Sequence, residues 1–401
     1  MFLAVSILYF LYTLVKIYIA FMEIGYIKKE RGGKPIILSE ENYIKAADYK
    51  IENTKLDIIT TFFGYLVFVA WFGFGLEYLE SFFTITDKAI LAVAYVISFM
   101  MINFVLTIGF DIYVTFKLDK KYGFSKMTPK LYIIDTVKSG AISLIFGGLI
   151  IWLISLIILN FPLWWFYGFI FIFALIVGIN LIYPTLIAPM FNKFTKLEDD
   201  DLRIAIENLM KSVGLKSSGI FMMDASKRDS RLNAYFGGLG SSKRVVLFDT
   251  LIEKLNKNEL LAVLGHELGH FKNKDIIKNI AIMGVMFFAI FALFGQLPNS
   301  LFEAVHIENA PHGIITLFLM LSTPIFFFIM PVFGLVSRAN EYEADEFGAE
   351  CESEEDLANA LIKLSNENKS FPKSHTLSII FYHTHPPVIE RLKRLGVDFE
   401  D

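Results

Sequence analysis

The chain of 401 residues is 55% hydrophobic and only 19% charged, which is too apolar for an ordinary soluble protein. Its net charge of −4 excludes the basic character expected of a nucleic-acid-binding protein. The lone cysteine, Cys351, excludes an intramolecular disulfide and a cysteine-based zinc site. We therefore expect a protein of the lipid bilayer, with no nucleic acid as partner.

Seven stretches are long and apolar enough to cross a bilayer. They lie at roughly 2–25, 58–83, 89–116, 139–160, 163–189, 276–297 and 313–336. The first has no basic residue before its apolar run and is too long for a cleavable signal peptide, so we interpret it as a retained membrane helix. The alternative for the last two is a buried helical hairpin in a soluble domain, but their phenylalanine-rich, charge-poor sequences favour membrane spans.

The basic residues predict the orientation in the membrane. The loop 26–57 carries seven lysines and arginines and the loop 117–138 carries six, whereas the loops on the other side carry only Lys88. Because positive loops stay in the cytoplasm, the N-terminus is predicted outside and the C-terminus inside. The two large polar segments then share the cytoplasmic face, provided that spans six and seven form a hairpin.

This reading divides the chain into four parts. They are an N-terminal membrane region with five transmembrane helices (1–189), a cytoplasmic part (190–275), a transmembrane hairpin (276–336) and a C-terminal cytoplasmic part (337–401).

The first cytoplasmic part contains a predicted pair of strands. Residues Arg244 to Phe248 have the pattern of a buried strand, and Asn233 to Gly237 are predicted as an extended edge before a glycine-containing turn. Such an edge can hold a peptide as an added strand, and Asn233 would hydrogen-bond its backbone. The alternative is an ordinary β-hairpin whose asparagine serves the turn.

Residues 266–270 read His-Glu-Leu-Gly-His and are the most informative motif of the chain. On a helix, His266 and His270 lie one turn apart on one face, where two imidazoles can bind one Zn²⁺. Glu267 would lie close to the metal and take a proton from water. The alternative is a surface helix with two unrelated histidines.

A catalytic zinc needs a third protein ligand and an open position. Residues 337–349 look like a helix leaving the membrane, on which Glu341 and Asp345 share a face. Glu341 is the predicted third ligand, and Asp345 would accept the Nδ1–H of a zinc histidine. The alternative is a solvated acidic helix with routine ion pairs.

His385 stands before Pro386-Pro387, which fix the backbone ahead of a helix predicted from near Val388. A rigidly placed imidazole beside a metal can donate a hydrogen bond to an oxyanion. The alternative is a plain turn histidine.

Taken together, these motifs resemble the integral-membrane zinc metallopeptidases of the CAAX prenyl protease 1 type. The resembling stretches occur in order at Thr115-Phe116, Lys121 to Phe124, Asp135, Lys138, Ile187 to Pro189, Lys193 to Thr195, Ser226 to Arg228, Asn233 to Phe236, Arg244 to Thr250, His266 to His270, Ser337 to Asp345, His385 to Pro387 and Glu390 to Leu392.

The resemblance implies a mainly α fold, in which seven membrane helices form a chamber capped by a cytoplasmic, zincin-like α+β metallopeptidase domain. It implies one Zn²⁺ per chain and a protein or peptide substrate, prenylated in this family. The implied roles are zinc ligation by His266, His270 and Glu341, catalysis by Glu267, substrate or oxyanion contact by Asn233 and His385, and support of the site by Asp345. A proton-donor role for this aspartate is the alternative, which we find less natural because a residue that orients a zinc histidine is not free to protonate a leaving group.

We therefore expect a zinc-dependent membrane endopeptidase that cuts near the C-terminus of prenylated Cys-a-a-X proteins. The alternatives are a heat-shock-type protease that clears damaged membrane proteins, a transporter and an inactive scaffold. Seven spans rather than about four favour the first reading over the heat-shock type. A transporter would show inverted repeats and broken helices, which the sequence lacks. A scaffold would not need the complete set of ligands and base.

Overall fold

The computed structural model describes residues 1–215, 219–237 and 244–399 and is mainly α-helical. Within these residues, seven helical segments are long and apolar enough to cross a membrane, and each overlaps one predicted span. They are Phe2–Arg31, Glu40–Glu80, Lys88–Lys121, Pro129–Asn160, Trp164–Phe191, Asp275–Phe294 and Pro311–Cys351. Continuous helices suit this setting because they satisfy every backbone hydrogen bond within the segment.

In the described part of the chain, four of these segments contain a π-helical turn, which interrupts the regular α-helical hydrogen bonding. The second segment consists of α2 (Glu40–Ala70), a π-turn (Trp71–Gly75) and α3 (Leu76–Glu80), and the third consists of α4 (Lys88–Tyr113), a π-turn (Val114–Leu118) and α5 (Asp119–Lys121). The fourth consists of α6 (Pro129–Ile142), a π-turn (Ser143–Gly147) and α7 (Gly148–Asn160). The fifth consists of α8 (Trp164–Ile182), a π-turn (Tyr183–Ile187) and α9 (Ala188–Phe191). The first, sixth and seventh are single helices, α1 (Phe2–Arg31), α13 (Asp275–Phe294) and α15 (Pro311–Cys351).

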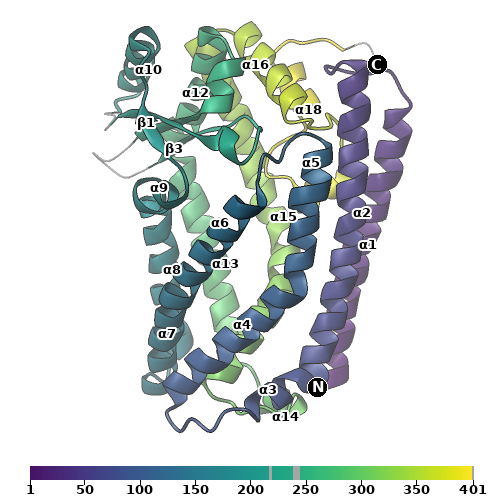
Figure 1. Ribbon diagram of the computed structural model, residues 1–401, viewed down its shortest axis with the longest axis vertical. Coiled ribbons are helices and arrows are strands. Elements are labelled where there is room, and N and C mark those ends of the chain that lie inside the picture. Colours follow the sequence, from purple (N-terminus) through teal and green to yellow (C-terminus); the bar gives the residue numbers. More distant parts are fainter. Residues whose placement is uncertain (216–218, 238–243, 400–401) are drawn as a thin grey trace.

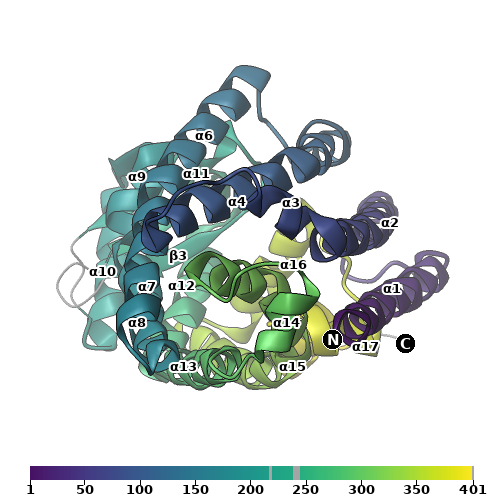
Figure 2. The ribbon, with the colours of Figure 1, turned by 90° about the horizontal axis from the view of Figure 1, so that it is seen from below.

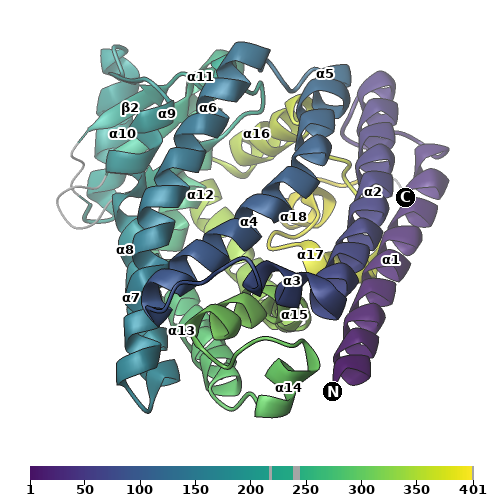
Figure 3. The same cartoon turned by 60° about the horizontal axis from the view of Figure 1, so that its bottom comes forward.

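The membrane helices are arranged as a ring when the molecule is viewed along its long axis (Figure 2). Neighbours in the ring include α1 with α2, α8 with α13, and α15 with both α4 and α7. In the tilted view, α4 runs obliquely across the front of the ring (Figure 3). This is the helical architecture that the resemblance implied.

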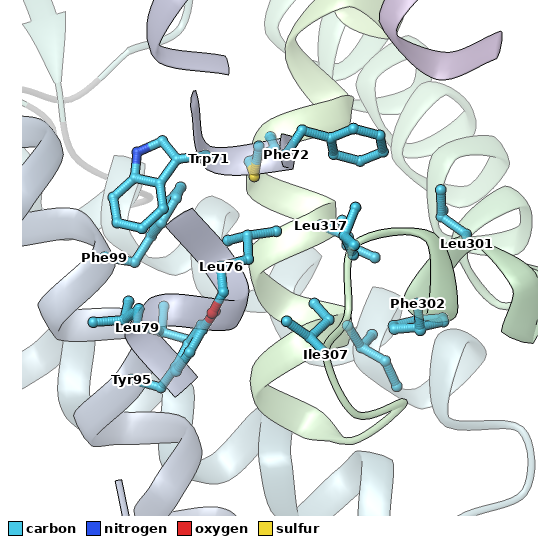
Figure 4. Packing of buried hydrophobic residues seen from close by; sticks show 14 of the residues in the cluster. Trp71, Phe72, Leu76, Leu79, Tyr95, Phe99, Leu301, Phe302, Ile307 and Leu317 are labelled. Atoms are coloured by element: carbon cyan, nitrogen blue, oxygen red, sulfur yellow. The ribbon is translucent and has the colours of Figure 1, made fainter. Parts of the chain in front are cut away.

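A cluster of large apolar side chains closes one end of the ring. It joins the π-turn of the second segment and α4 to α15 and to α14 (Asn299–Ala304). Phe72, Leu76, Tyr95 and Leu317 are fully buried there (Figure 4). Because these side chains are shielded from both lipid and water, this end of the ring is closely packed.

A small α+β domain lies at the opposite end. Its helices are α10 (Asp200–Ser212), α11 (Asp249–Lys254), α12 (Lys257–Lys272), α16 (Glu354–Glu367), α17 (Thr376–Tyr382) and α18 (Val388–Arg394). Its strands are β1 (Phe194–Lys196), β2 (Ile220–Met223), β3 (Ala234–Gly237) and β4 (Arg244–Phe248). The strand order is β1-β2-β4-β3, with β4 parallel to β2 and antiparallel to β3.

The predicted strand Arg244 to Phe248 is β4, and the predicted extended edge is β3 at the end of the sheet. Leu247 of β4 packs with apolar residues of α10, α12 and α16 into one core. The glycine-containing turn predicted after Gly237 lies outside the described residues.

The basic loops and the small domain lie at one end of the molecule, and the N-terminus lies at the other. Figure 1 shows the N-terminus at the bottom and the sheet, α12, α16 and α18 at the top, together with the α1–α2 connection and α5. The two basic loops therefore lie at the same end as the small domain, as the hairpin formed by α13 and α15 requires.

Candidate metal and active site

The helix α12 begins where its sequence predicts a start. Asn256 caps it, and the side chain of Glu259 bonds back to the Asn256 N–H, which completes a capping box. Leu260, Leu261, Leu264 and Leu268 are buried against the sheet and α16. This packing leaves the face with His266 and His270 turned towards α15, with which α12 makes its most extensive contact.

Glu341 of α15 meets both histidines. His266 Nε2 lies 3.5 Å from Glu341 Oε2, and His270 Nε2 lies 3.3 Å from Glu341 Oε1. One ligand atom from each of the three residues lies within 4.8 Å of the others. The structure thus brings α12 and the C-terminal part of α15 together, although α13 and the rest of α15 lie between them in the chain.

The donor atoms fit a metal ion. Each histidine turns Nδ1 to a second carboxylate, so Nδ1 carries the proton and the Nε2 lone pair is free to bind a metal. Glu341 Oε2 is buried and has no hydrogen-bond partner among the residues that the structure describes; Arg391 Nη1 lies 3.7 Å away, too far for a hydrogen bond, so this oxygen can still bind a metal ion. Two imidazoles and one carboxylate are a known ligand set of catalytic zinc, which leaves a fourth position open.

Small residues allow this close approach, and the sequence analysis missed them. A Cβ on Gly269 would lie 2.9 Å from Ala344 Cα, and one on Gly348 would lie 2.9 Å from His266 N. Gly265 also faces Cys351 and Gly348. The spacing of four between Gly265 and Gly269 is the small-residue pattern of closely packed helices, and it is readable from the sequence.

Asp345 is held between a histidine and an arginine. Its Oδ1 lies 2.8 Å from His266 Nδ1, and its two oxygens accept hydrogen bonds from Arg391 Nε at 2.7 Å and Nη2 at 2.5 Å. Arg391 of α18 was assigned no role in the site by sequence analysis. Both carboxylate oxygens of Asp345 are therefore engaged, and the geometry fits a residue that orients His266.

His270 has an equivalent partner that the sequence analysis also missed. Its Nδ1 lies 3.0 Å from Oδ2 of Asp275, the first residue of α13, and Lys278 donates to Asp275 Oδ1 at 2.9 Å. Asp275 is only 2% exposed. An acidic residue five positions after a zinc-type histidine is a signal that could have identified it.

Glu267 follows the first histidine and lies close to both imidazoles. Burial raises the pKa of its carboxyl group, while protonated forms of the neighbouring His266 and His270 would lower it. A carboxyl group with a raised pKa accepts a proton more readily than an exposed glutamate, which is the property that a general base needs near neutral pH.

The two predicted substrate-contacting residues lie at different parts of the site. His385 Nε2 is 3.2 Å from Glu341 Oε1, so the imidazole stands beside the candidate metal ligands although it is largely exposed. Asn233 precedes the edge strand β3, and its Oδ1 accepts the Ala234 N–H at 2.8 Å. That N–H is one that an added strand would use.

Comparisons with known proteins match nearly the whole chain. The profile of peptidase family M48 matches residues 196–397, and that of the CAAX prenyl protease N-terminal region, five membrane helices, matches residues 34–193. "CAAX prenyl protease 1 homolog" of Arabidopsis thaliana is 32% identical, with 91% of this chain and 89% of the relative covered. "CAAX prenyl protease 1" of Saccharomyces cerevisiae is 36% identical, with 71% and 67% covered.

The fold also has a counterpart among solved structures. The crystal structure of S. mikatae Ste24p superposes with a TM-score of 0.91 at 28% identity, covering 99% of both chains.

Proposed function

Because the chain belongs to peptidase family M48, as a membrane metalloendopeptidase of the CAAX prenyl protease 1 type, we propose that its metal is zinc, held by His266, His270 and Glu341. One observation carries this proposal: ligand atoms of all three residues lie within 4.8 Å of one another although they come from two distant segments. Zinc is favoured because neutral imidazole nitrogens with one carboxylate suit this ion.

The residues around the metal have separate roles in the proposed reaction. Zinc, when bound, polarises the scissile carbonyl and makes water more acidic. Glu267 accepts the water proton and returns it to the leaving amine. Asp345 and Asp275 hold His266 and His270 in the tautomer that presents Nε2.

Two residues are proposed to bind the substrate. His385 donates a hydrogen bond to the oxyanion, which its position 3.2 Å from Glu341 supports. Asn233 hydrogen-bonds the backbone of a substrate that pairs with the free edge of β3. An extended peptide bound in this way presents one peptide bond to the metal ligands.

We propose a prenylated Cys-a-a-X protein as the substrate, in keeping with the names of the relatives. We also propose that the small domain is cytoplasmic and the N-terminus external, because the basic loops share the end that carries the metal site. The four-part division at 1–189, 190–275, 276–336 and 337–401 belongs to the same proposal, since it separates the membrane parts from the two parts that build the site.

The test uses one peptide with and without a farnesyl group on its cysteine, incubated with the zinc-loaded protein and with a chelator. Cleavage of the farnesylated peptide that the chelator abolishes is the expected result. Equal cleavage of both forms, together with degradation of a misfolded membrane protein, would favour the clearance function instead. A Glu267→Gln variant is expected to retain its zinc and lose turnover, and activity above a few per cent would show that another group is the base.

A further inference from the structure

The free edge of β3 offers hydrogen bonds at alternate residues. The carbonyl of Asn233 accepts from Phe248 N on β4 at 3.1 Å, so Asn233 faces β4. Since successive residues of a strand face opposite sides, the backbone groups of Leu232, Ala234 and Phe236 face the free edge. The Ala234 N–H is held by Asn233 Oδ1, so an added strand can pair with the Ala234 carbonyl and with the backbone of Phe236.

Pairing cannot continue past Leu232, because its backbone is already occupied. The side-chain amide of Asn368 accepts the Leu232 N–H at 2.8 Å and donates to the Leu232 carbonyl at 3.2 Å. One carboxamide thus takes the place that the next residue of an added strand would take. The free edge ends at this point.

A cation that forms no ion pair among the described residues stands beside this end. Lys369 follows Asn368, and its Nζ lies 4.6 Å from the centre of the Phe124 ring. Arg231 lies over the same ring at 4.1 Å, but it is neutralised by Asp229 at 2.6 Å and Asp119 at 3.2 Å. In the described part of the chain, Lys369 forms no ion pair with a carboxylate.

From this arrangement we propose that the substrate's C-terminus ends at Leu232, where Asn368 stops the added strand and the Lys369 ammonium binds the terminal carboxylate. The proposal rests on the proposed edge-strand binding of the substrate. It places the residues after the scissile bond along the edge from Ala234 towards Leu232. A fixed end of this kind limits how many residues can follow the cut.

The backbone at Lys369 supports a role for its side chain. Its φ is +43°, in the left-handed region, just after α16 ends. Glycine is the relaxed choice at such a position, so the chain places a lysine there against the local conformational preference. Burial lowers the pKa of Lys369, and nearby Lys45, Arg231 and Lys126 lower it further against the opposing effect of Glu367. An arriving carboxylate would offset these effects.

The experiment compares three farnesylated peptides of one sequence: three residues after the cysteine with a free carboxylate, the same peptide as a C-terminal amide, and the free acid extended by two residues. With the zinc-loaded protein, the amide is expected to raise KM by about tenfold or more, the effect of losing one charge-assisted hydrogen bond. The extended peptide is expected to be cleaved poorly at the same bond.

The decisive variant is Lys369→Gly, which removes the cation and relieves the backbone strain. The melting temperature should not fall, kcat should stay near that of the unaltered protein, and KM for the acid should rise to that of the amide. Lys369→Arg should restore the preference for the acid. Lys254→Ala removes a lysine that pairs with Glu367, and it should leave the acid-to-amide ratio unchanged. Asn368→Ala should improve cleavage of the extended peptide relative to the acid.

Two results would overturn the proposal while the proposed function stands. One is equal kcat/KM for acid and amide with the unaltered protein, and the other is an unchanged ratio in Lys369→Gly. Failure of the zinc-loaded protein to cleave any of the peptides would instead refute the proposed function, and this inference with it.

Discussion

Replacing Asp345 by asparagine separates the two roles considered for this residue. Asp345 is 3% exposed, and its oxygens contact His266 and Arg391. If it orients His266, the substitution weakens zinc binding because an amide no longer accepts the Nδ1–H as a charged partner. If it donates a proton to the leaving group, the substitution lowers turnover without affecting the metal.

The magnitude follows from the contacts. Loss of a carboxylate behind a metal-bound histidine weakens metal affinity by about 10- to 100-fold, or roughly 1.4–2.7 kcal/mol. The variant also removes the closer of two carboxylates that face Arg391, whose side chain is 11% exposed, and leaves only Glu341 Oε2 at 3.7 Å from its Nη1. Breaking a buried ion pair by removing one partner costs about 3–5 kcal/mol, so the melting temperature should fall as well.

The assay measures the zinc dissociation constant by competition with a chromophoric chelator, and then kcat at saturating zinc. Weaker zinc binding with kcat close to that of the unaltered protein is the expected outcome. A fall in kcat of more than about 100-fold at full zinc occupancy, the size of effect expected from losing a proton donor, would refute the orienting role. Glu346→Gln, on the exposed side of α15, is the matched control and should change neither quantity.

Three further outcomes are expected. Gly348→Ala should destabilise the protein by about 1–3 kcal/mol and weaken zinc binding, because its Cβ would meet the backbone of α12 at 2.9 Å, whereas Gly140→Ala has open space and should be near neutral in thermal unfolding. Burial lowers the pKa of His383 from 6.5 to about 4, so the unfolded chain binds a proton at this residue more readily than the folded chain. The free energy of unfolding should therefore fall by about 2 kcal/mol as the pH is lowered from 7 to 5. Denaturant titrations of His383→Gln should show a weaker dependence on pH. Chelation should abolish peptide cleavage and added zinc should restore it; cleavage that persists in a metal-free sample by elemental analysis would contradict a metal-dependent reaction.

Local patterns in the sequence predicted much of the architecture. The seven spans are visible because a bilayer demands long apolar runs, and β4 is visible because Val245 to Phe248 form a short continuous apolar run that begins with two β-branched residues. The pair His266 and His270 follows from helical spacing alone. Glu341 could be predicted as their partner because the charged loops place both segments on one side of the membrane.

Partners brought together only by folding could not be predicted in this way. Arg391 reaches Asp345 from a different helix, and Asn368 meets Leu232 across the small domain. No periodicity relates such positions, since their contact depends on how the helices pack. Asp275 is an intermediate case, because it lies close in sequence to His270 but its direction depends on the turn between α12 and α13.

The proposed division of the metal ligands between α12 and α15, with Glu267 as the proposed base, has a consequence for biosynthesis. A nascent chain that has emerged only as far as α12 carries two imidazoles and the base but not the carboxylate that completes the set. On this proposal, the metal site is complete only after α13 and α15 have formed their hairpin and brought Glu341 to α12. We therefore expect a newly made copy to stay inactive as a peptidase until its last hairpin is in place.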